Sequence, residues 1–266
     1  MEFIKQTSIV MNVVNKGFDH NSIRLPDLNK SGIVYFDNIY EISDEKKEKL
    51  ESSINSIGRQ DQLGFVLVDL YTGQGVSYNG EDIFYSASTI KGPYVTCLNQ
   101  EIPSSKEKHS SYMIETIKNS DNMKYRALKN AYGSIEFEEW LKEAGCGTIN
   151  AYKEYTDITP KALTQMWIKM YSYFVSGEEN SEWCRDLFVS TKNSFISDML
   201  SDEYVVYSKA GWLYASSYIR SQHDGGIVVK DEHPYVIVVL SNAYGKQDAL
   251  GEVVQCLDEI HTEMIK

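Results

Sequence analysis

Ser88 and Lys91 stand three positions apart at the start of an apolar segment. If this segment is helical, one turn places the two side chains on the same face. A serine hydroxyl becomes a nucleophile when a neighbouring base accepts its proton, and a lysine amine of lowered pKa can be that base. The same Ser-x-x-Lys spacing occurs in the charged segments Ser43–Lys46 and Ser105–Lys108, where we interpret it as coincidence.

Two further motifs carry polar groups suited to the same chemistry. The triplet Ser120–Asn122 reads SDN and lies between two predicted helices, and the triplet Lys209–Gly211 reads KAG and follows a predicted strand. Each also has an ordinary structural explanation, because Ser, Asp and Asn are common helix caps and a triplet ending in Gly commonly terminates a strand. The functional hypothesis therefore depends on the three motifs together.

In this chain order, Ser-x-x-Lys, SDN and Lys-[Ser/Thr]-Gly are the signature of class A β-lactamases and penicillin-binding proteins. The sequence thus resembles the penicillin-recognising serine hydrolases, in particular their class A β-lactamase-like branch. The similarity extends from about Ser43 to the C-terminus. It includes Gly64–Tyr78, Pro93, Thr159-Pro160, Lys209–Trp212 and His223–Val228.

The resemblance implies roles in catalysis for four residues. Ser88 would be the acylated nucleophile and Lys91 its base, made less basic by burial and by the charge of Lys209. Ser120 would pass a proton to the leaving nitrogen. Lys209 would also supply positive potential toward a substrate carboxylate.

Substrate binding would involve three further residues. Asn122 would hold the amide side chain of the substrate, and Gly211 and Trp212 would follow Lys209 along the edge of the site. The backbone N–H groups of Ser88 and Trp212 would form an oxyanion hole.

The sequence departs from the family pattern at two places. Ala210 stands where the family has Ser or Thr, so binding of a substrate carboxylate should be weakened. The segment 146–158 is short, and it lacks the Glu-x-x-Leu-Asn sequence; in class A β-lactamases this region is a long loop carrying the glutamate that activates water for deacylation. Glu154 is a possible substitute base, although a solvated loop residue is the simpler interpretation, and Asp157 and Lys91 are alternatives. We therefore predict that acylation outruns deacylation.

These features predict a β-lactamase-related serine hydrolase that forms an acyl-enzyme on Ser88 with a small-molecule substrate, either a β-lactam or a peptidoglycan-like peptide. Two alternatives remain. One is a D,D-peptidase, amidase or esterase on the same fold. The other is a weakly catalytic penicillin-binding or sensor domain.

The resemblance and the order of the elements predict an α/β (α+β) protein with the β-lactamase/transpeptidase-like fold. Residues 1–40 would form an N-terminal arm and 41–266 the catalytic domain. Within that domain, 41–85 and 203–266 would form an α/β lobe, and 86–202 an inserted all-helical lobe. The sheet would be antiparallel with about five strands.

Apolar periodicity and turn signals predict the individual elements. The expected strands are Gly32–Phe36 in the arm, Leu63–Leu70, Val76–Tyr78, Tyr204–Ser208, Gly226–Lys230 and Tyr235–Ser241. The expected helices are Ser43–Ile57, Thr89–Asn99, Tyr112–Asn119, Met123–Ala131, Ile135–Ala144, Pro160–Phe174 and Lys246–Ile265. The first and last of these helices should cover one face of the sheet.

The composition limits the class of protein. The chain has 266 residues, a 42% apolar fraction and a net charge of −12. The apolar fraction suffices for a sizeable core, whereas the acidity argues against nucleic-acid binding. No apolar run is long enough to span a bilayer, so we expect no stable membrane insertion. The histidines lack ligand spacing, which predicts neither metal nor cofactor.

The cysteines and the expected location complete the sequence interpretation. Cys97, Cys146, Cys184 and Cys256 are far apart, and we expect buried apolar residues, with one disulfide left open. The family's usual substrates lie outside the cytoplasmic membrane. We therefore expect a monomeric, exported bacterial protein whose leader is absent from this chain, with a cytoplasmic location as the alternative.

Overall fold

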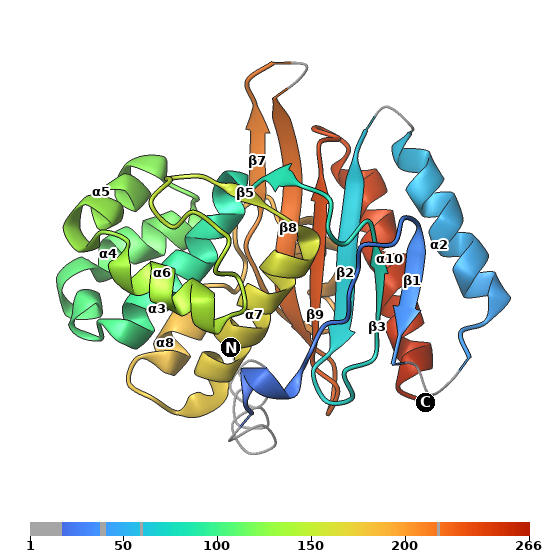
Figure 1. Cartoon of the computed structure of the whole chain (residues 1–266), viewed down its shortest axis with the longest axis horizontal. Coiled ribbons are helices and arrows are strands. Elements are labelled where there is room, and N and C mark those ends of the chain that lie inside the picture. Colours follow the sequence, from blue (N-terminus) through green and yellow to red (C-terminus); the bar gives the residue numbers. More distant parts are fainter. Residues whose placement is uncertain (1–17, 38–40, 59–60, 217–218) are drawn as a thin grey trace.

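The centre of the protein is an antiparallel sheet (Figure 1). The computed structural model describes residues 18–37, 41–58, 61–216 and 219–266. Within these ranges the strands lie in the order β1-β3-β2-β9-β8-β6, and β7 also pairs with β8. Their bounds are β1 Ile33–Phe36, β2 Leu63–Asp69, β3 Gly75–Tyr78, β6 Val205–Ser208, β7 Gly211–Tyr214, β8 Arg220–Val229 and β9 Tyr235–Ser241.

This sheet has seven strands, whereas the sequence predicts about five. The strand expected inside the arm is β1, and it extends the sheet because it pairs with β3. At the opposite edge, β6 pairs with residues 226–229 of β8 and β7 pairs with residues 220–223. β8 is 10 residues long and carries both partners, whereas the sequence predicted only its apolar second half.

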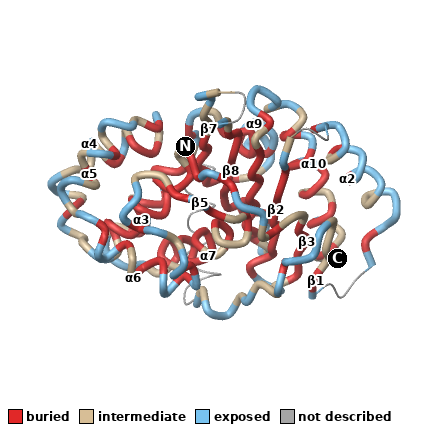
Figure 2. Tube along the Cα trace, turned by 45° about the horizontal axis from the view of Figure 1, so that its top comes forward, coloured by how far each residue is buried: buried red, intermediate tan, exposed pale blue. Residues whose placement is uncertain are grey.

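Helices cover both faces of the sheet. One face packs against α2 (Asp44–Ile57), α9 (Phe195–Leu200) and α10 (Gln247–Met264), which confirms the placement of the first and last predicted helices. Successive residues of a strand face opposite sides, so alternate residues of β2 enter two different cores. Phe65 and Leu67 join the core with α10, while Val66 and Val68 join the core with α7. The whole of β2 is consequently buried (Figure 2).

The other face supports the helical lobe. Helix α7 (Pro160–Ser176) crosses behind β2 and β9, and its predicted apolar stripe is buried. Thr159 caps this helix by accepting a hydrogen bond from the Ala162 N–H at 3.1 Å, as the Thr-Pro start predicts. The remaining helices of the lobe are α3 Lys91–Glu101, α4 Ser104–Lys118, α5 Asn122–Tyr132, α6 Ile135–Glu143 and α8 Ser181–Asp186.

The start of α2 differs in detail from the prediction. Ser43 occupies the predicted N-cap position, but its side chain does not cap the helix. Its N–H and hydroxyl donate instead to the carboxylate of Glu263 in α10, at 2.8 and 3.0 Å. This residue therefore joins the two covering helices, and Gly58 ends α2 as expected.

A two-stranded ribbon lies between the helical lobe and the sheet. It pairs β4 (Phe84–Tyr85) with β5 (Asp157–Ile158), and a 3-10 helix, η2 (Ala87–Ile90), follows β4 directly. Neither short strand was predicted. A second 3-10 helix, η1, spans His20–Ser22.

The four cysteines are buried and unpaired. In the part of the chain that the structure describes, none of the helices combines the length and apolar character that crossing a bilayer requires.

Candidate active site

Ser88 lies in η2, directly before α3, so the Ser-x-x-Lys motif does open a helix. Ser88 is half-buried, whereas Lys91 is fully buried in the first turn of α3. The residue before the nucleophile, Ala87, has φ of 44°. A positive φ is rare for alanine because its Cβ crowds the backbone, so the chain is strained where it presents Ser88.

Lys91 points from α3 toward the SDN triplet. Its Nζ donates to the backbone carbonyl of Ser120 at 2.7 Å and to Oδ1 of Asn122. Burial lowers the pKa of Lys91 to about 8, and the carboxylates of Asp121 and Glu154 partly oppose this shift. Near neutral pH a useful fraction of Lys91 is therefore the neutral amine that a general base requires.

Within the SDN triplet, Asp121 stabilises the start of α5, whereas Ser120 and Asn122 contact Lys91. Asp121 caps α5 by accepting a hydrogen bond from the Lys124 N–H at 2.9 Å, which is the ordinary role predicted for such residues. Ser120 precedes the cap with φ of 58°, and this left-handed turn directs its carbonyl to Lys91. Asn122 begins α5 and accepts from the hydroxyl of Tyr155 at 2.9 Å.

Lys209 reaches the same serine from the sheet. Its Nζ donates to Ser120 Oγ at 3.0 Å and to the carbonyl of Ala210 at 2.7 Å. Burial, and then the charge of Lys91, lower the pKa of Lys209 to about 7. Ser120 is thus held between two buried amines, with Lys91 at its carbonyl and Lys209 at its hydroxyl.

Gly211 brings β7 against the nucleophile. A Cβ at this position would lie 2.9 Å from Ser88 N and 2.8 Å from Thr89 N, so only glycine fits. This close approach sets the following residue, Trp212, beside Ser88. Together they line a small pocket with Tyr85, Ala87, Asn122, Tyr155 and Leu213.

The structure therefore brings seven of the eight sequence-predicted site residues to one place. They are Ser88, Lys91, Ser120, Asn122, Lys209, Gly211 and Trp212. Glu154 lies nearby, but its two carboxylate oxygens accept from Arg126 on α5 at 3.0 and 3.1 Å.

Sequence reasoning missed two tyrosines in the pocket. Tyr155 directly follows Glu154 in the loop before β5. Lys91 Nζ lies 5.9 Å from the ring centre of Tyr155, whereas the carboxylate of Glu154 is paired with Arg126. Burial raises the pKa of the Tyr155 hydroxyl, so it donates a hydrogen bond and is a poor base at neutral pH. Tyr85, 6.0 Å from Tyr155 between ring centres, completes this side of the pocket.

A buried histidine anchors the ribbon beside the pocket. His223 Nδ1 accepts from the Ser241 N–H at 2.9 Å, so its proton is on Nε2, which lies 2.8 Å from the carbonyl of Tyr85. Burial lowers the pKa of His223 to about 4. The neutral ring thus connects β9, β8 and β4.

Comparison with known proteins identifies the family and the fold. The chain matches the β-lactamase enzyme family (Beta-lactamase2) over residues 47–106 and 110–256, and it belongs to that family. The predicted family and fold class are confirmed. No curated protein matches the sequence.

Solved structures with the same fold have low sequence identity. A β-lactamase from Sphaerobacter thermophilus DSM 20745 is 13% identical with a TM-score of 0.69, covering 81% of this chain and 98% of that one. PBP-A is 15% identical with a TM-score of 0.66, covering 81% and 96%. A class A β-lactamase from Mycobacterium abscessus is 14% identical with a TM-score of 0.64, covering 82% and 99%.

Proposed function

We propose that this protein is a serine hydrolase that forms an acyl-enzyme on Ser88 and deacylates slowly. The observation that carries the proposal is the pair of buried amines around Ser120, next to the pocket that contains Ser88. Two lysines of lowered pKa on one serine have no evident structural use, and perturbed titratable groups gather at catalytic sites.

The proposed acylation uses these groups in order. Ser88 Oγ attacks the carbonyl carbon of the substrate while its proton passes to neutral Lys91. The N–H groups of Ser88 and Trp212 stabilise the oxyanion. The bond to the leaving nitrogen or oxygen then breaks as Ser120 gives its hydroxyl proton to that atom. Lys209 donates to Ser120 Oγ and is placed to restore the proton.

Deacylation needs a base that activates water, and such a base contributes typically about 10²–10⁴-fold. The segment 146–158 presents Tyr155 to the site, and the ion pair with Arg126 holds the carboxylate of Glu154. Lys91 and the exposed Asp157 are the remaining candidate bases. We therefore expect an acyl-Ser88 that persists for many minutes, and weak turnover of β-lactams.

Mass spectrometry of the intact protein during incubation with a penicillin tests this proposal. We expect one adduct of penicillin mass that decays slowly and is absent in Ser88→Ala. Ser43→Ala is the matched control, because Ser43 has the same spacing to Lys46 and lies outside the pocket. An adduct that survives in Ser88→Ala, or rapid hydrolysis of a chromogenic cephalosporin without an adduct, would contradict the proposal.

An esterase or amidase is the second candidate. Ala210 has no hydroxyl for a substrate carboxylate, and Tyr85, Trp212 and Leu213 give the pocket an apolar rim. Activated esters without a carboxylate should then acylate Ser88 at least as well as penicillins do. We also propose that the protein acts outside the cytoplasmic membrane, and fractionation of the native host cells tests this.

A further inference from the structure

The pocket at Ser88 is small for a substrate. Its volume is about 80 Å³, whereas small-molecule sites usually measure about 300–1,000 Å³. Most of a bound substrate must therefore lie outside it, and the surroundings of the pocket decide which substrates bind well.

The ribbon of β4 and β5 leads away from Ser88. Exposure alternates along β5 and along β4 with the residue before it: Ile83, Tyr85 and Asp157 are exposed, whereas Phe84 and Ile158 are buried. The exposed side chains consequently share one face of the ribbon. Tyr85 lines the pocket at Ser88, and Ile83 is two residues, about 7 Å, further along.

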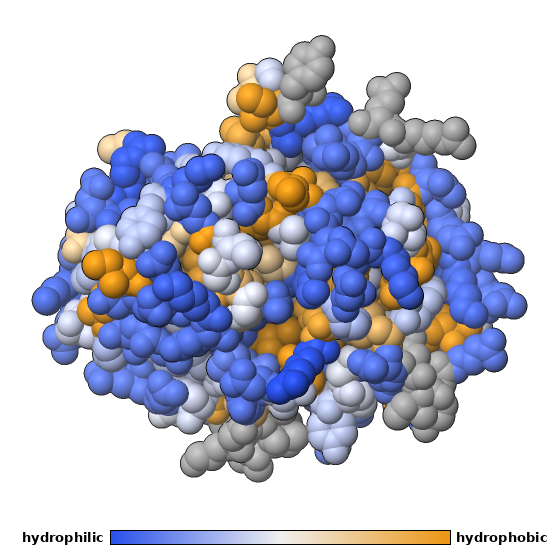
Figure 3. All heavy atoms as spheres, viewed as in Figure 1, coloured by the Kyte–Doolittle hydropathy of each residue, from blue (hydrophilic) through white to orange (hydrophobic). Residues whose placement is uncertain are grey.

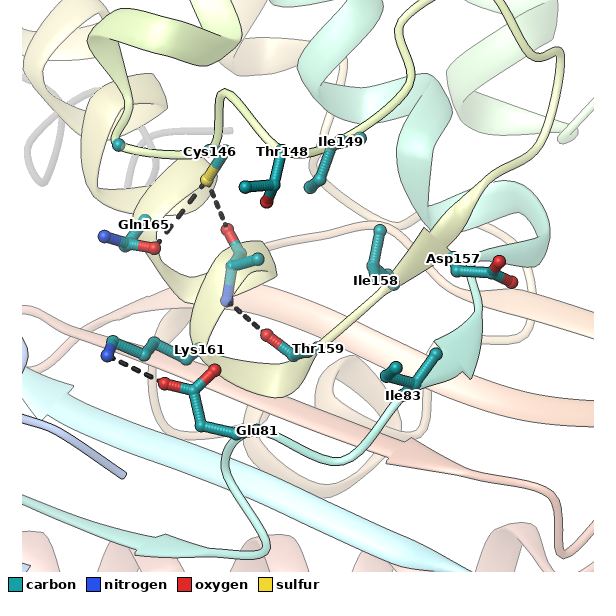
Figure 4. A pocket seen from close by; sticks show the side chains of 12 residues that line it. Glu81, Ile83, Cys146, Thr148, Ile149, Asp157, Ile158, Thr159, Lys161 and Gln165 are labelled. Carbon is teal, nitrogen blue, oxygen red and sulfur yellow. Dashed lines mark hydrogen bonds and ion pairs between the residues drawn. The ribbon is translucent and has the colours of Figure 1, made fainter. Parts of the chain in front are cut away.

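A second, larger pocket opens at the far end of this ribbon. Its volume is about 400 Å³. Figure 4 shows Ile83 and Ile158 on one side, Thr148 and Ile149 above, and Lys161 with Glu81 below. Apolar surface gathers in the middle of this face, between the more polar surfaces on either side (Figure 3). The exposed face of the ribbon thus joins the two pockets, with Tyr85 and Ile83 as its apolar side chains and Asp157 beside them.

The charges of this second pocket favour a chain without a carboxylate. Its lysine, Lys161, is neutralised by Glu81 at 2.8 Å. Asp157 adds an exposed carboxylate on the ribbon. An anionic chain would find no unpaired cation among the residues that line this pocket, while an apolar chain would cover Ile83.

We propose that the acyl chain of the substrate runs from the carbonyl at Ser88, over Tyr85, into the pocket beside Ile83. The preferred substrate is then an ester or amide with an extended, apolar acyl chain that carries no carboxylate. This inference rests on the proposed acylation of Ser88, and it specifies the substrate class of the same site.

Acylation kinetics with p-nitrophenyl esters of acetate, hexanoate and decanoate test the inference, together with the monoester of decanedioate. In the wild type we expect kcat/KM to rise on the order of tenfold from the acetyl to the decanoyl ester. The carboxylate-ended chain should lose most of this gain. If deacylation is slow, the rate of p-nitrophenol release in the first turnover gives the same comparison between esters as kcat/KM.

Ile83→Trp fills the path and should remove the preference for the decanoyl ester while leaving the acetyl ester unchanged. Ile135→Trp is the matched control, because Ile135 on α6 is 66% exposed and Ile83 is 69% exposed. Equal kcat/KM for all chain lengths in the wild type, or equal effects of Ile83→Trp on short and long esters, would overturn the inference. Failure of every ester and of penicillin to acylate Ser88 would instead overturn the proposed function.

Discussion

His223 should make the stability of this protein fall in mild acid. The ring is 1% exposed, and both nitrogens are engaged as a neutral imidazole, with Nδ1 accepting from Ser241. A second proton on Nδ1 would break that hydrogen bond and bury a charge. Burial accordingly lowers the pKa of His223 from 6.5 to about 4.

The sign and size of the effect follow from linkage. The unfolded chain takes up the proton first, so the stabilising effect is complete above pH 6.5 and is lost as the pH falls toward 4. A shift from 6.5 to about 4 corresponds to about 3 kcal/mol in total, of which about 2 kcal/mol is lost by pH 5. For a chain of this size, about 2 kcal/mol lowers the melting temperature by about 4–8 °C.

The assay compares melting temperatures of the wild type and His223→Gln at pH 7 and pH 5. Asp224, the next residue, also contributes to the pH dependence of the melting temperature. Burial raises its pKa to about 7, so its contribution to stability changes with pH in the opposite direction. Subtracting the variant from the wild type cancels that contribution. The wild type should lose about 4–8 °C more than the variant on going to pH 5. Equal losses would refute the reasoning that the folded state excludes protonated His223.

Three shorter predictions concern the proposed chemistry. The rate of Ser88 acylation should rise about tenfold per pH unit up to about pH 7, because the pKa of Lys91 is about 8 and Lys209, whose pKa is about 7, still carries its proton there; a pH profile of penicillin labelling measures this. Gly211→Ala should reduce labelling by more than about tenfold, because the added Cβ lies 2.9 Å from Ser88 N; unchanged labelling would contradict the close approach of β7. Glu154→Gln should change the lifetime of the adduct by less than about twofold if its ion pair with Arg126 excludes it from catalysis, and a large increase in lifetime would identify it as the deacylation base.

The sequence predicted the elements whose stability is local or apolar. Helix α7 has a capping Thr159, a first-turn Pro160 and an apolar stripe, and all three signals agree with the structure. The strands with continuous apolar residues, β2 and β9, were predicted for the same reason. The site motifs could be located because they resemble a known family and because each lies at an element boundary.

The elements that the sequence missed depend on distant partners. The first half of β8 contains Ser221, Gln222 and His223, which resemble a polar loop but are at most 2% exposed. Such polar residues can be buried when other elements supply their hydrogen-bond partners, as the Tyr85 carbonyl and the Ser241 N–H do for His223. No local pattern reveals those partners, so only the family resemblance of Lys209–Trp212 and His223–Val228 pointed to strands here.

The departures from ordinary local preference are concentrated at the proposed site. Of the eight non-glycine residues with positive φ in the described ranges, five are Asn or Asp, which tolerate this conformation. Of the other three, Ala87 directly precedes Ser88 and Ser120 accepts from Lys91, while Ser190 is not among the residues that line the pocket. Buried lysines are likewise unfavourable unless they are neutralised or hydrogen-bonded. A chain selected for stability alone would avoid a strained alanine in this pocket and two buried amines beside it, so their coincidence favours a catalytic over a purely structural role for the three motifs.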